Sequence, residues 1–342
     1  MIEKYFIRND LTLKRWRRFK RNRTAMVWCW VLITFSTFSF TAGLWADSKP
    51  LIMKWHGETF VPFVKNYHPT LFGREDIQVM DYRSLKFEND DWALWPIIHW
   101  DPYESNKTVA NYPSPPTRDN FMGTDDRGRD VFARLLYGYR YSIGYAFSVW
   151  FLSYLLGTLI GAMNGYIGGK VDLLGSRAVE IIDMMPWLLL LITMISIFGA
   201  SMTLLISFTV VFGWTDIYHQ MRSQFLQLRK RDYVEAARAI GASHGRIVLK
   251  HILPNALTPL VTFSPFAIAA NISGLALLDY LGLGIEAPTP SWGELMSQAQ
   301  QYFTTSEWLV WFPSAALLLT MIALINIGLA IRDAFDSKAA VG

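Results

Sequence analysis

The sequence of 342 residues has a single cysteine and few charged side chains. One cysteine, Cys29, excludes a disulfide within the chain and argues against a cysteine-ligated metal site. Only 18% of the residues are Asp, Glu, Lys or Arg, whereas 52% are hydrophobic. A soluble domain carries about 25% charged residues, so this balance is typical of a membrane protein.

Signatures of ATP binding and of metal binding are also missing. A phosphate-binding loop needs the pattern G-x-x-x-x-G-K-S/T. Around Gly169 and Lys170, the nearest candidate has Asn164 in place of the first glycine and Val171 in place of Ser or Thr. The six histidines are scattered and form no H-E-x-x-H pattern. We therefore expect neither ATP hydrolysis nor a metal site in this chain.

Long stretches without Asp, Glu, Lys or Arg indicate membrane spans. A spanning helix needs about 20 predominantly apolar residues. Four stretches have the length of one span, namely 24–46, 141–169, 257–278 and 308–331. A fifth, 184–215, would be about 48 Å long as a single helix, against about 30 Å of hydrocarbon.

The fifth stretch divides at Gly199, Ala200 and Ser201, which are typical turn residues. We split it there into two helices, the first of which begins before Asp183 and places Glu180 and Asp183 near the headgroups. The sequence therefore predicts an all-α integral membrane protein with six transmembrane helices and a large external insertion after the first.

Lysine and arginine in the short loops predict the orientation. Residues 1–23 and the loop 218–256 are rich in both, whereas 282–307 contains neither. We therefore expect the first two segments to be cytoplasmic and the third to be external, with both termini inside. Beside a span, the basic leader meets anionic lipid headgroups rather than nucleic acid. The first apolar run is longer than the 7–15 residues of a signal peptide, so we interpret it as a retained helix.

The expected organisation has five parts from the N-terminus onward. They are a basic cytoplasmic leader (1–23), the first transmembrane helix (24–46), a periplasmic segment (47–137), a permease core with five transmembrane helices (138–336) and a tail (337–342).

The loop 218–256 predicts two short helices joined at a glycine. Glu, Ala and Arg in 231–239 favour a first helix, which Gly241 ends. Ser243 is placed to cap a second helix, and Pro254 ends or kinks it. From spacing alone, such a pair is either a docking element or an amphipathic pair that lies on the membrane surface.

Glu235, Ala236 and Ala237, followed by Gly241 and by Leu253-Pro254, resemble the EAA motif of binding-protein-dependent ABC importer permeases. Three further segments resemble the dipeptide/oligopeptide branch of that family: 123–130 (GTDDRGRD), 231–238 (RDYVEAAR) and 281–293 (LGLGIEAPTPSWG). The likeness covers about 119–336 together with the leader and the first span.

The resemblance implies that these helices dock on a cytoplasmic ATPase. The implied coupling residues are Glu235, Ala236, Ala237, Gly241, Leu253 and Pro254. It also implies three partners: a second homologous permease, an ABC ATPase with two domains or copies that carries ATP and Mg, and a periplasmic substrate-binding protein. This chain would be a transport subunit rather than an enzyme, and would itself bind no cofactor.

The long insertion and the overall likeness indicate the Yej-type group. The implied cargo is oligopeptides, including microcin C-like peptide antibiotics, which would cross the bacterial inner membrane. Residues 47–118 would dock the binding protein or only cover the outer face. An ion channel or a membrane-embedded enzyme is the alternative function, and dependence on a separate ATPase distinguishes them.

Asp279 is a candidate substrate-pathway residue. An acid inside or near a span is a functional-site hypothesis, and this one would suit the amine of a peptide. In the other interpretation, Asp279 lies at the outer headgroup level, because 257–278 already completes a span.

Overall fold

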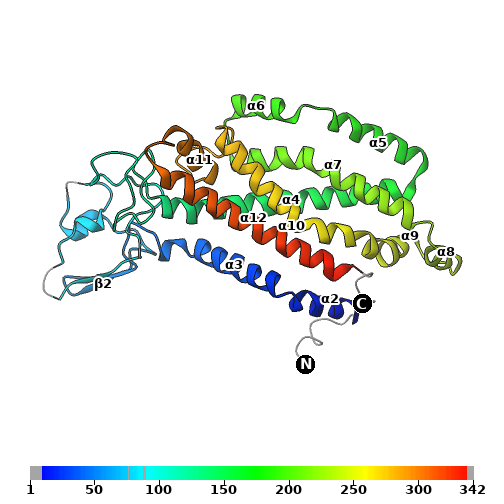
Figure 1. Ribbon diagram of the computed structural model, residues 1–342, viewed down its shortest axis with the longest axis horizontal. Helices are drawn as coiled ribbons and strands as arrows, with labels where there is room; N and C mark the ends of the chain where they lie inside the picture. Colours follow the sequence, from blue (N-terminus) through cyan, green and yellow to red (C-terminus); the bar gives the residue numbers. More distant parts are fainter. Residues whose placement is uncertain (1–9, 76, 88–89, 337–342) are drawn as a thin grey trace. The chain divides into compact units, whose positions relative to one another are not determined.

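The computed structural model describes residues 10–75, 77–87 and 90–336 (Figure 1). They form two compact units. One contains the chain up to Leu32, Ile143–Leu275 and the chain from Leu319 on, and the other contains Ile33–Ser142 and Ala276–Leu318. The first nine residues of the predicted leader and the predicted tail lie outside the described residues.

Two helices begin the described chain. Helix α2 spans Asp10–Arg21 and α3 spans Arg23–Phe40. Between them, the Asn22 side chain accepts a hydrogen bond from the backbone N–H of Ala25 at 3.1 Å, which caps α3. The predicted first span, 24–46, is too long: the chain leaves the α-helix after Phe40 and tightens into a 3₁₀ turn, η1, at Ala42–Leu44.

Three helices are long and apolar enough to cross a membrane. They are α4 (Val131–Ile167), the helix His244–Tyr280, and α12 (Glu307–Phe335). The second comprises α9 (His244–Arg246), a π-helical stretch, η4 (Ile247–Ile252), and α10 (Leu253–Tyr280). These confirm three of the predicted apolar spans as long helices. Helix α4 begins before the predicted span, because it also accommodates two arginines. Buried ion pairs hold Arg134 in its first turn, and Arg140 donates to the Ser39 carbonyl oxygen.

A bent pair supplies a fourth candidate span. Helix α5 (Gly169–Asp183) and α6 (Trp187–Phe198) meet at 66° across a short break that contains Pro186. Proline lacks the N–H that a continuous helix would need there. Asp183 therefore lies at a bend in the chain. The helical segment that was expected to begin before Asp183 begins at Gly169.

The predicted split of 184–215 is confirmed. Helix α6 ends at Phe198, and α7 spans Met202–Leu228. Gly199 has φ +76°, in the region that favours glycine. The Ser201 hydroxyl then accepts a hydrogen bond from the N–H of Leu204 at 3.2 Å and caps α7. The remaining helices are α8 (Asp232–Ala239) and α11 (Trp292–Gln301).

The insertion contains a three-stranded antiparallel sheet in the order β2-β1-β3. The strands are β1 (Ile52–Trp55), β2 (Glu58–Phe60) and β3 (Trp92–Leu94), with Met53 opposite both Phe60 and Ala93. Two 3₁₀ turns, η2 (Pro69–Phe72) and η3 (Tyr82–Ser84), pack beside it. Met53, Phe72 and Tyr82 are buried among further aromatic rings, so the insertion has a hydrophobic cluster of its own.

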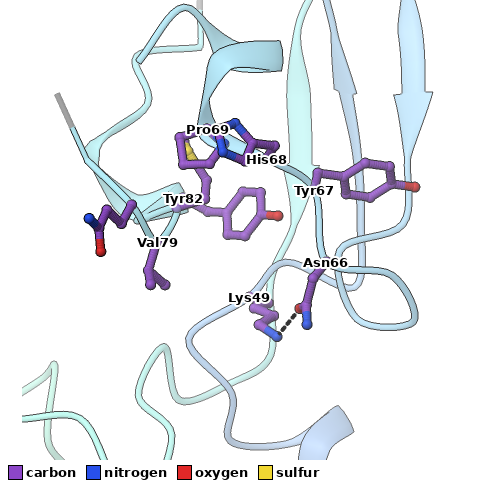
Figure 2. A pocket seen from close by; sticks show the side chains of 9 residues that line it. Lys49, Asn66, Tyr67, His68, Pro69, Val79 and Tyr82 are labelled. Carbon is purple, nitrogen blue, oxygen red and sulfur yellow. Dashed lines mark hydrogen bonds between the residues drawn. The ribbon is translucent and has the colours of Figure 1, made fainter. Parts of the chain in front are cut away.

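A cavity of about 430 Å³ opens beside this aromatic cluster (Figure 2). Two of its lining residues lie side by side: the Lys49 ammonium donates a hydrogen bond to the Asn66 side chain at 2.6 Å. The other lining residues are mainly aromatic, amide or apolar: Tyr67, His68, Pro69, Gln78, Val79, Met80 and Tyr82. A single lysine, itself hydrogen-bonded, gives the cavity no strong preference for a charged ligand.

Glycines every four residues bring α4 against the backbone of α7. A Cβ atom added at Gly157, Gly161 or Gly165 would lie 2.6 Å from a carbonyl oxygen of α7. The three oxygens belong to residues that are themselves four apart, Trp214, Tyr218 and Arg222. Small residues at this spacing let two helix backbones approach closely. The contact, here called the α4–α7 glycine seam, fixes which face of α7 is covered.

We predict that Gly161→Ala lowers thermal stability, because its methyl group cannot fit against the Tyr218 carbonyl oxygen without separating the helices. Gly144 of α4 has no atom within 4 Å of an added Cβ, so Gly144→Ala is the matched control. This control should be neutral or stabilising by about 0.5–1 kcal/mol, since alanine is the better helix former. Melting of the detergent-solubilised variants measures both. Equal melting temperatures for the two variants would contradict the seam.

Candidate functional site

The connection between α7 and α10, residues 229–252, begins with helix α8. Asp232 and Glu235 lie in its first turn and Arg238 in its last, as the helix dipole favours. At its end, the N–H of Gly241 bonds to the Arg238 carbonyl at 3.0 Å, and the N–H of Ala242 bonds to the Ala237 carbonyl at 3.1 Å. This is a Schellman motif, and Gly241 has the required positive φ, +86°.

The second helix of the connection does not stop at Pro254. It starts at His244, passes through the π-helical stretch Ile247–Ile252 and continues to Tyr280. Of the two outcomes predicted for Pro254, an end or a kink, the first is therefore excluded. A π turn widens the backbone directly before the proline, and such turns accommodate a disrupted hydrogen-bond ladder. Ser243 occupies the predicted N-cap position, but its side chain makes no capping hydrogen bond.

The six residues predicted for coupling divide into two groups. Glu235, Ala236, Gly241 and Pro254 are exposed. Ala237 and Leu253 instead pack on a hydrophobic cluster. The buried members of this cluster come from α7, the connection and α10: Ile217, Met221, Phe225, Val234, Ile247, Ile252, Ala256 and Leu260. One face of the connection is therefore exposed, and its other face packs on the hydrophobic cluster.

Polar contacts to the end of α4 also hold the connection. The Tyr166 hydroxyl lies 2.7 Å from Nδ1 of His244. The Arg229 guanidinium donates to the Tyr166 carbonyl oxygen at 3.1 Å. The exposed face of α8 is thus tied both to α7, through the cluster, and to the last turn of α4.

Ile240 is a surface residue that the sequence analysis missed. It directly precedes Gly241 and its exposed fraction is 87%. Tyr233, at the other end of α8, is 42% exposed. A large apolar side chain directly before the C-terminal glycine of a helix is the signal that would have found it. Together with exposed Ala236, these two residues make the outward surface of the connection partly apolar.

Asp279 accepts two hydrogen bonds from the loop that follows α10. Its side chain is buried, one oxygen accepts from the N–H of Ile285 at 2.8 Å, and the other accepts from the Ser291 hydroxyl. Gly284 and Gly293 are both so close that an added Cβ would collide with Asp279 atoms. Asp279 thus organises this loop, and its role in a substrate pathway stays a prediction.

A buried ion cluster joins the segment before α4 to α11. Arg129 bonds to Asp125 at 2.7 Å and to Glu294 at 3.0 Å. Arg134 pairs with Glu294 and lies 3.4 Å from Asp125. Both arginines and Asp125 are essentially inaccessible to solvent. Two segments that resemble family motifs, 123–130 and 281–293, therefore lie close together through charges at or beside their ends.

Burial and neighbouring charges shift the pKa values in this region. Burial raises the pKa of Asp126, and nearby Asp125 raises it further. Burial lowers the pKa of Arg129, but the carboxylates of Asp125 and Glu294 outweigh it and hold the pKa above its usual value. Burial also raises the pKa of Asp130 to about 6.

Comparison with known proteins identifies the family. The model of the family described as binding-protein-dependent transport system inner membrane component matches residues 154–341, more than half of the chain. The chain belongs to this family. A second family model, the N-terminal TM domain of oligopeptide transport permease C, matches residues 13–69. The first match includes the EAA-like residues, the connection and the part of α7 that forms the α4–α7 glycine seam.

Individual permeases match over most of their length. The inner membrane ABC transporter permease protein YejE of Escherichia coli is 39% identical, over 96% of this chain and 97% of its own. The peptidoglycan transport system permease protein YejE of Agrobacterium fabrum is 31% identical, over 96% and 93%. The oligopeptide transport system permease protein OppC of Bacillus subtilis is 34% identical, over 68% and 77%. The resemblance to oligopeptide and Yej-type permeases is therefore confirmed.

Among solved structures, the MetNI methionine ABC transporter in an inward-facing conformation is 20% identical, with a TM-score of 0.49. The match covers 60% of this chain and 98% of the matched MetNI chain. At this score the likeness carries no argument about fold or mechanism.

Asp130 gives this permease a pH-dependent stability. It caps α4 by accepting from the N–H of Ala133 at 2.8 Å, and it accepts from the Asn120 amide at 2.8 Å. Because its pKa rises on folding, the protonated form stabilises the folded chain. That stabilisation is complete below pH about 4 and is lost as the pH rises through about 6. Asparagine, also a good N-cap, has no such loss.

We therefore predict that the melting temperature of Asp130→Asn rises relative to the wild type between pH 4.5 and 7.5. The exposed neighbour Asp119 provides the control, and Asp119→Asn should follow the wild-type pH dependence. A difference between wild type and Asp130→Asn that stays constant across this range would contradict the assignment.

Proposed function

We propose that the chain is a permease subunit of an ATP-driven importer that carries peptides across the bacterial inner membrane. Family membership makes it a transport subunit of the inner membrane. The observation that carries the coupling part of the proposal is the exposed face of Glu235, Ala236 and Gly241. That face rests on a packed base and is tied to two long helices, as a docking surface that transmits motion requires.

The names of the relatives support a peptide-class cargo. One is an oligopeptide permease and another a peptidoglycan transport permease. Peptidoglycan contains short peptides, so both names agree with a peptide or a peptide-bearing fragment. Oligopeptides, including microcin C-like peptide antibiotics, are the cargo that we propose for this chain.

We propose six membrane spans, with both termini in the cytoplasm. Beyond the three long apolar helices and the bent α5–α6 pair, the remaining two spans would be α3 and α7. Helix α3 has only 18 residues, close to the minimum for a span. The basic segments on one side of this arrangement and the Lys- and Arg-free loop 282–307 on the other support it. The connection 229–252 is then cytoplasmic, and the insertion with its sheet is periplasmic.

Closure of the ATPase subunits would move α8, and α8 would move the helices to which it is tied. The hydrophobic cluster and the Tyr166 contacts would pass this motion to α7, α10 and α4. Two arrangements of similar free energy, biased by ATP, would expose the pathway alternately to the two sides. ATP and Mg would bind to the partner ATPase. A second permease and a periplasmic binding protein would complete the importer.

We expect Glu235→Lys to lower ATP-driven peptide uptake at least tenfold in the reconstituted transporter, because it reverses an exposed charge in the docking face. Lys170→Glu reverses an exposed charge at the start of α5, on the same side of the membrane, and should leave uptake near wild type. Uptake that is unchanged by Glu235→Lys, in a chain that is normally inserted, would contradict the coupling assignment.

Substitutions at two glycines test whether uptake depends on the backbone conformation at the end of α8, without changing any charge. Neither Gly241 nor Gly245 has an atom within 4 Å of an added Cβ, but only Gly241 has a positive φ. Gly241→Ala strains the Schellman motif by about 1–2 kcal/mol, so it should reduce uptake, whereas Gly245→Ala should not. Equal uptake by the two variants would show that coupling does not need this turn.

A further inference from the structure

Helix α7 has an exposed polar face in its second half. Its members recur every three or four residues, with one adjacent pair, and are all exposed: Asp216, His219, Gln220, Ser223 and Gln227. We call this set the α7 polar stripe. In the first half of α7 the exposed residues are Thr203, Ser207 and Val211, which carry no charge and lie on the opposite side of the helix from the stripe. The exposed side of α7 thus changes half-way along the helix, and in the second half it carries an acid, a histidine and two amides.

The glycine seam fixes the direction of this stripe. The covered face of α7 contains Tyr218, Met221 and Phe225, which are buried, and its backbone touches α4 through Tyr218. At about 100° per residue, the stripe lies on the side of the helix opposite to these residues. Rotating α7 to bury the stripe would break the seam, so the stripe must face something outside this part of the chain.

With α7 as a span, as proposed above, part of the stripe lies at membrane depth. From Met202, Asp216 is about 21 Å and His219 about 26 Å along the helix, against about 30 Å of hydrocarbon. Lipid chains cannot solvate a carboxylate or an amide. Ionisable residues at such depth face a bundle interior or a water-filled cavity and mark substrate pathways.

A hydrogen-bond partner from α5 extends the stripe. Nε2 of His219 lies 2.9 Å from a carboxylate oxygen of Asp183, at the bend between α5 and α6. The two side chains are 43% and 38% exposed, so this pair also faces outward. Asp216 has no hydrogen-bond or ion-pair partner among the described residues. The deepest member of the stripe is therefore an open carboxylate.

We infer that the α7 polar stripe lines the water-filled pathway, and that Asp216 binds the ammonium group of a peptide N-terminus as it passes. The inference rests on the proposed peptide transport. The Gln220 and Gln227 amides each offer donors and acceptors, which suit the N–H and C=O groups of any peptide backbone. The Asp216 carboxylate would therefore bind the N-terminus of a peptide, and the two amides would bind its backbone. Such a site would not select for particular peptide side chains.

Accessible cysteines test the water-filled pathway. In the assembled transporter with Cys29→Ser, Gln220→Cys and Val211→Cys are treated with a charged, water-soluble thiol reagent. We expect Gln220→Cys to react at least tenfold faster, and tri-alanine to slow that reaction without changing the Val211→Cys rate. Equal rates would overturn the inference. So would reaction without protection by tri-alanine, which would assign the stripe to the lipid headgroup region or to the partner permease.

Asp216→Asn tests the bound group. The KM for tri-alanine uptake should rise about tenfold with little change in kcat, because a charged hydrogen bond of about 1.5 kcal/mol is lost. The KM for N-acetyl-tri-alanine, which lacks the ammonium group, should already be high and should not change. An equal rise for both peptides, or no rise for either, would contradict ammonium binding. Failure of the wild-type assembly to transport tri-alanine would instead contradict the proposed cargo, and cysteine reactivity alone would then test the pathway.

Discussion

The close backbone contact between α4 and α7 determines which face of α7 is buried and which face is exposed. Three glycines four residues apart let α4 reach the carbonyl oxygens of α7, and that approach leaves no freedom to rotate α7 about its axis. One face of α7 then joins the hydrophobic cluster beneath the connection, and the opposite face turns its polar residues outward. The docking surface and the polar stripe are consequences of one packing constraint.

The connection gains its rigidity from contacts of different kinds. The Schellman motif at Gly241 ends α8, Val234 and Ile252 pack into the cluster, and His244 meets Tyr166 of α4. Each contact alone is worth about 1–3 kcal/mol. Their combination lets an exposed eight-residue helix, too short to be stable alone, keep a fixed position.

Local residue chemistry predicted the turns better than the helix lengths. Gly199 to Ser201 and Gly241 were predictable, because positive φ and capping are properties of single residues. The continuation through Pro254 was not, since a π turn depends on how the whole helix packs. The early start of α4 was hidden by Arg134 and Arg140, which interrupt the uncharged run. The charge of Arg134 is offset by Glu294, far away in the sequence. The α7 stripe had a readable signal, polar residues three and four apart, which a search for uncharged runs does not detect.

The proposed transport requires this chain to work within an assembly, and purification in mild detergent from its native membrane tests that directly. Mass spectrometry of the purified complex should find an ABC ATPase and a second permease of the same family, both in fixed proportion to this chain. Reproducible recovery of the chain alone, or as a homo-oligomer, would contradict the account and would leave the exposed face of α8 without a partner.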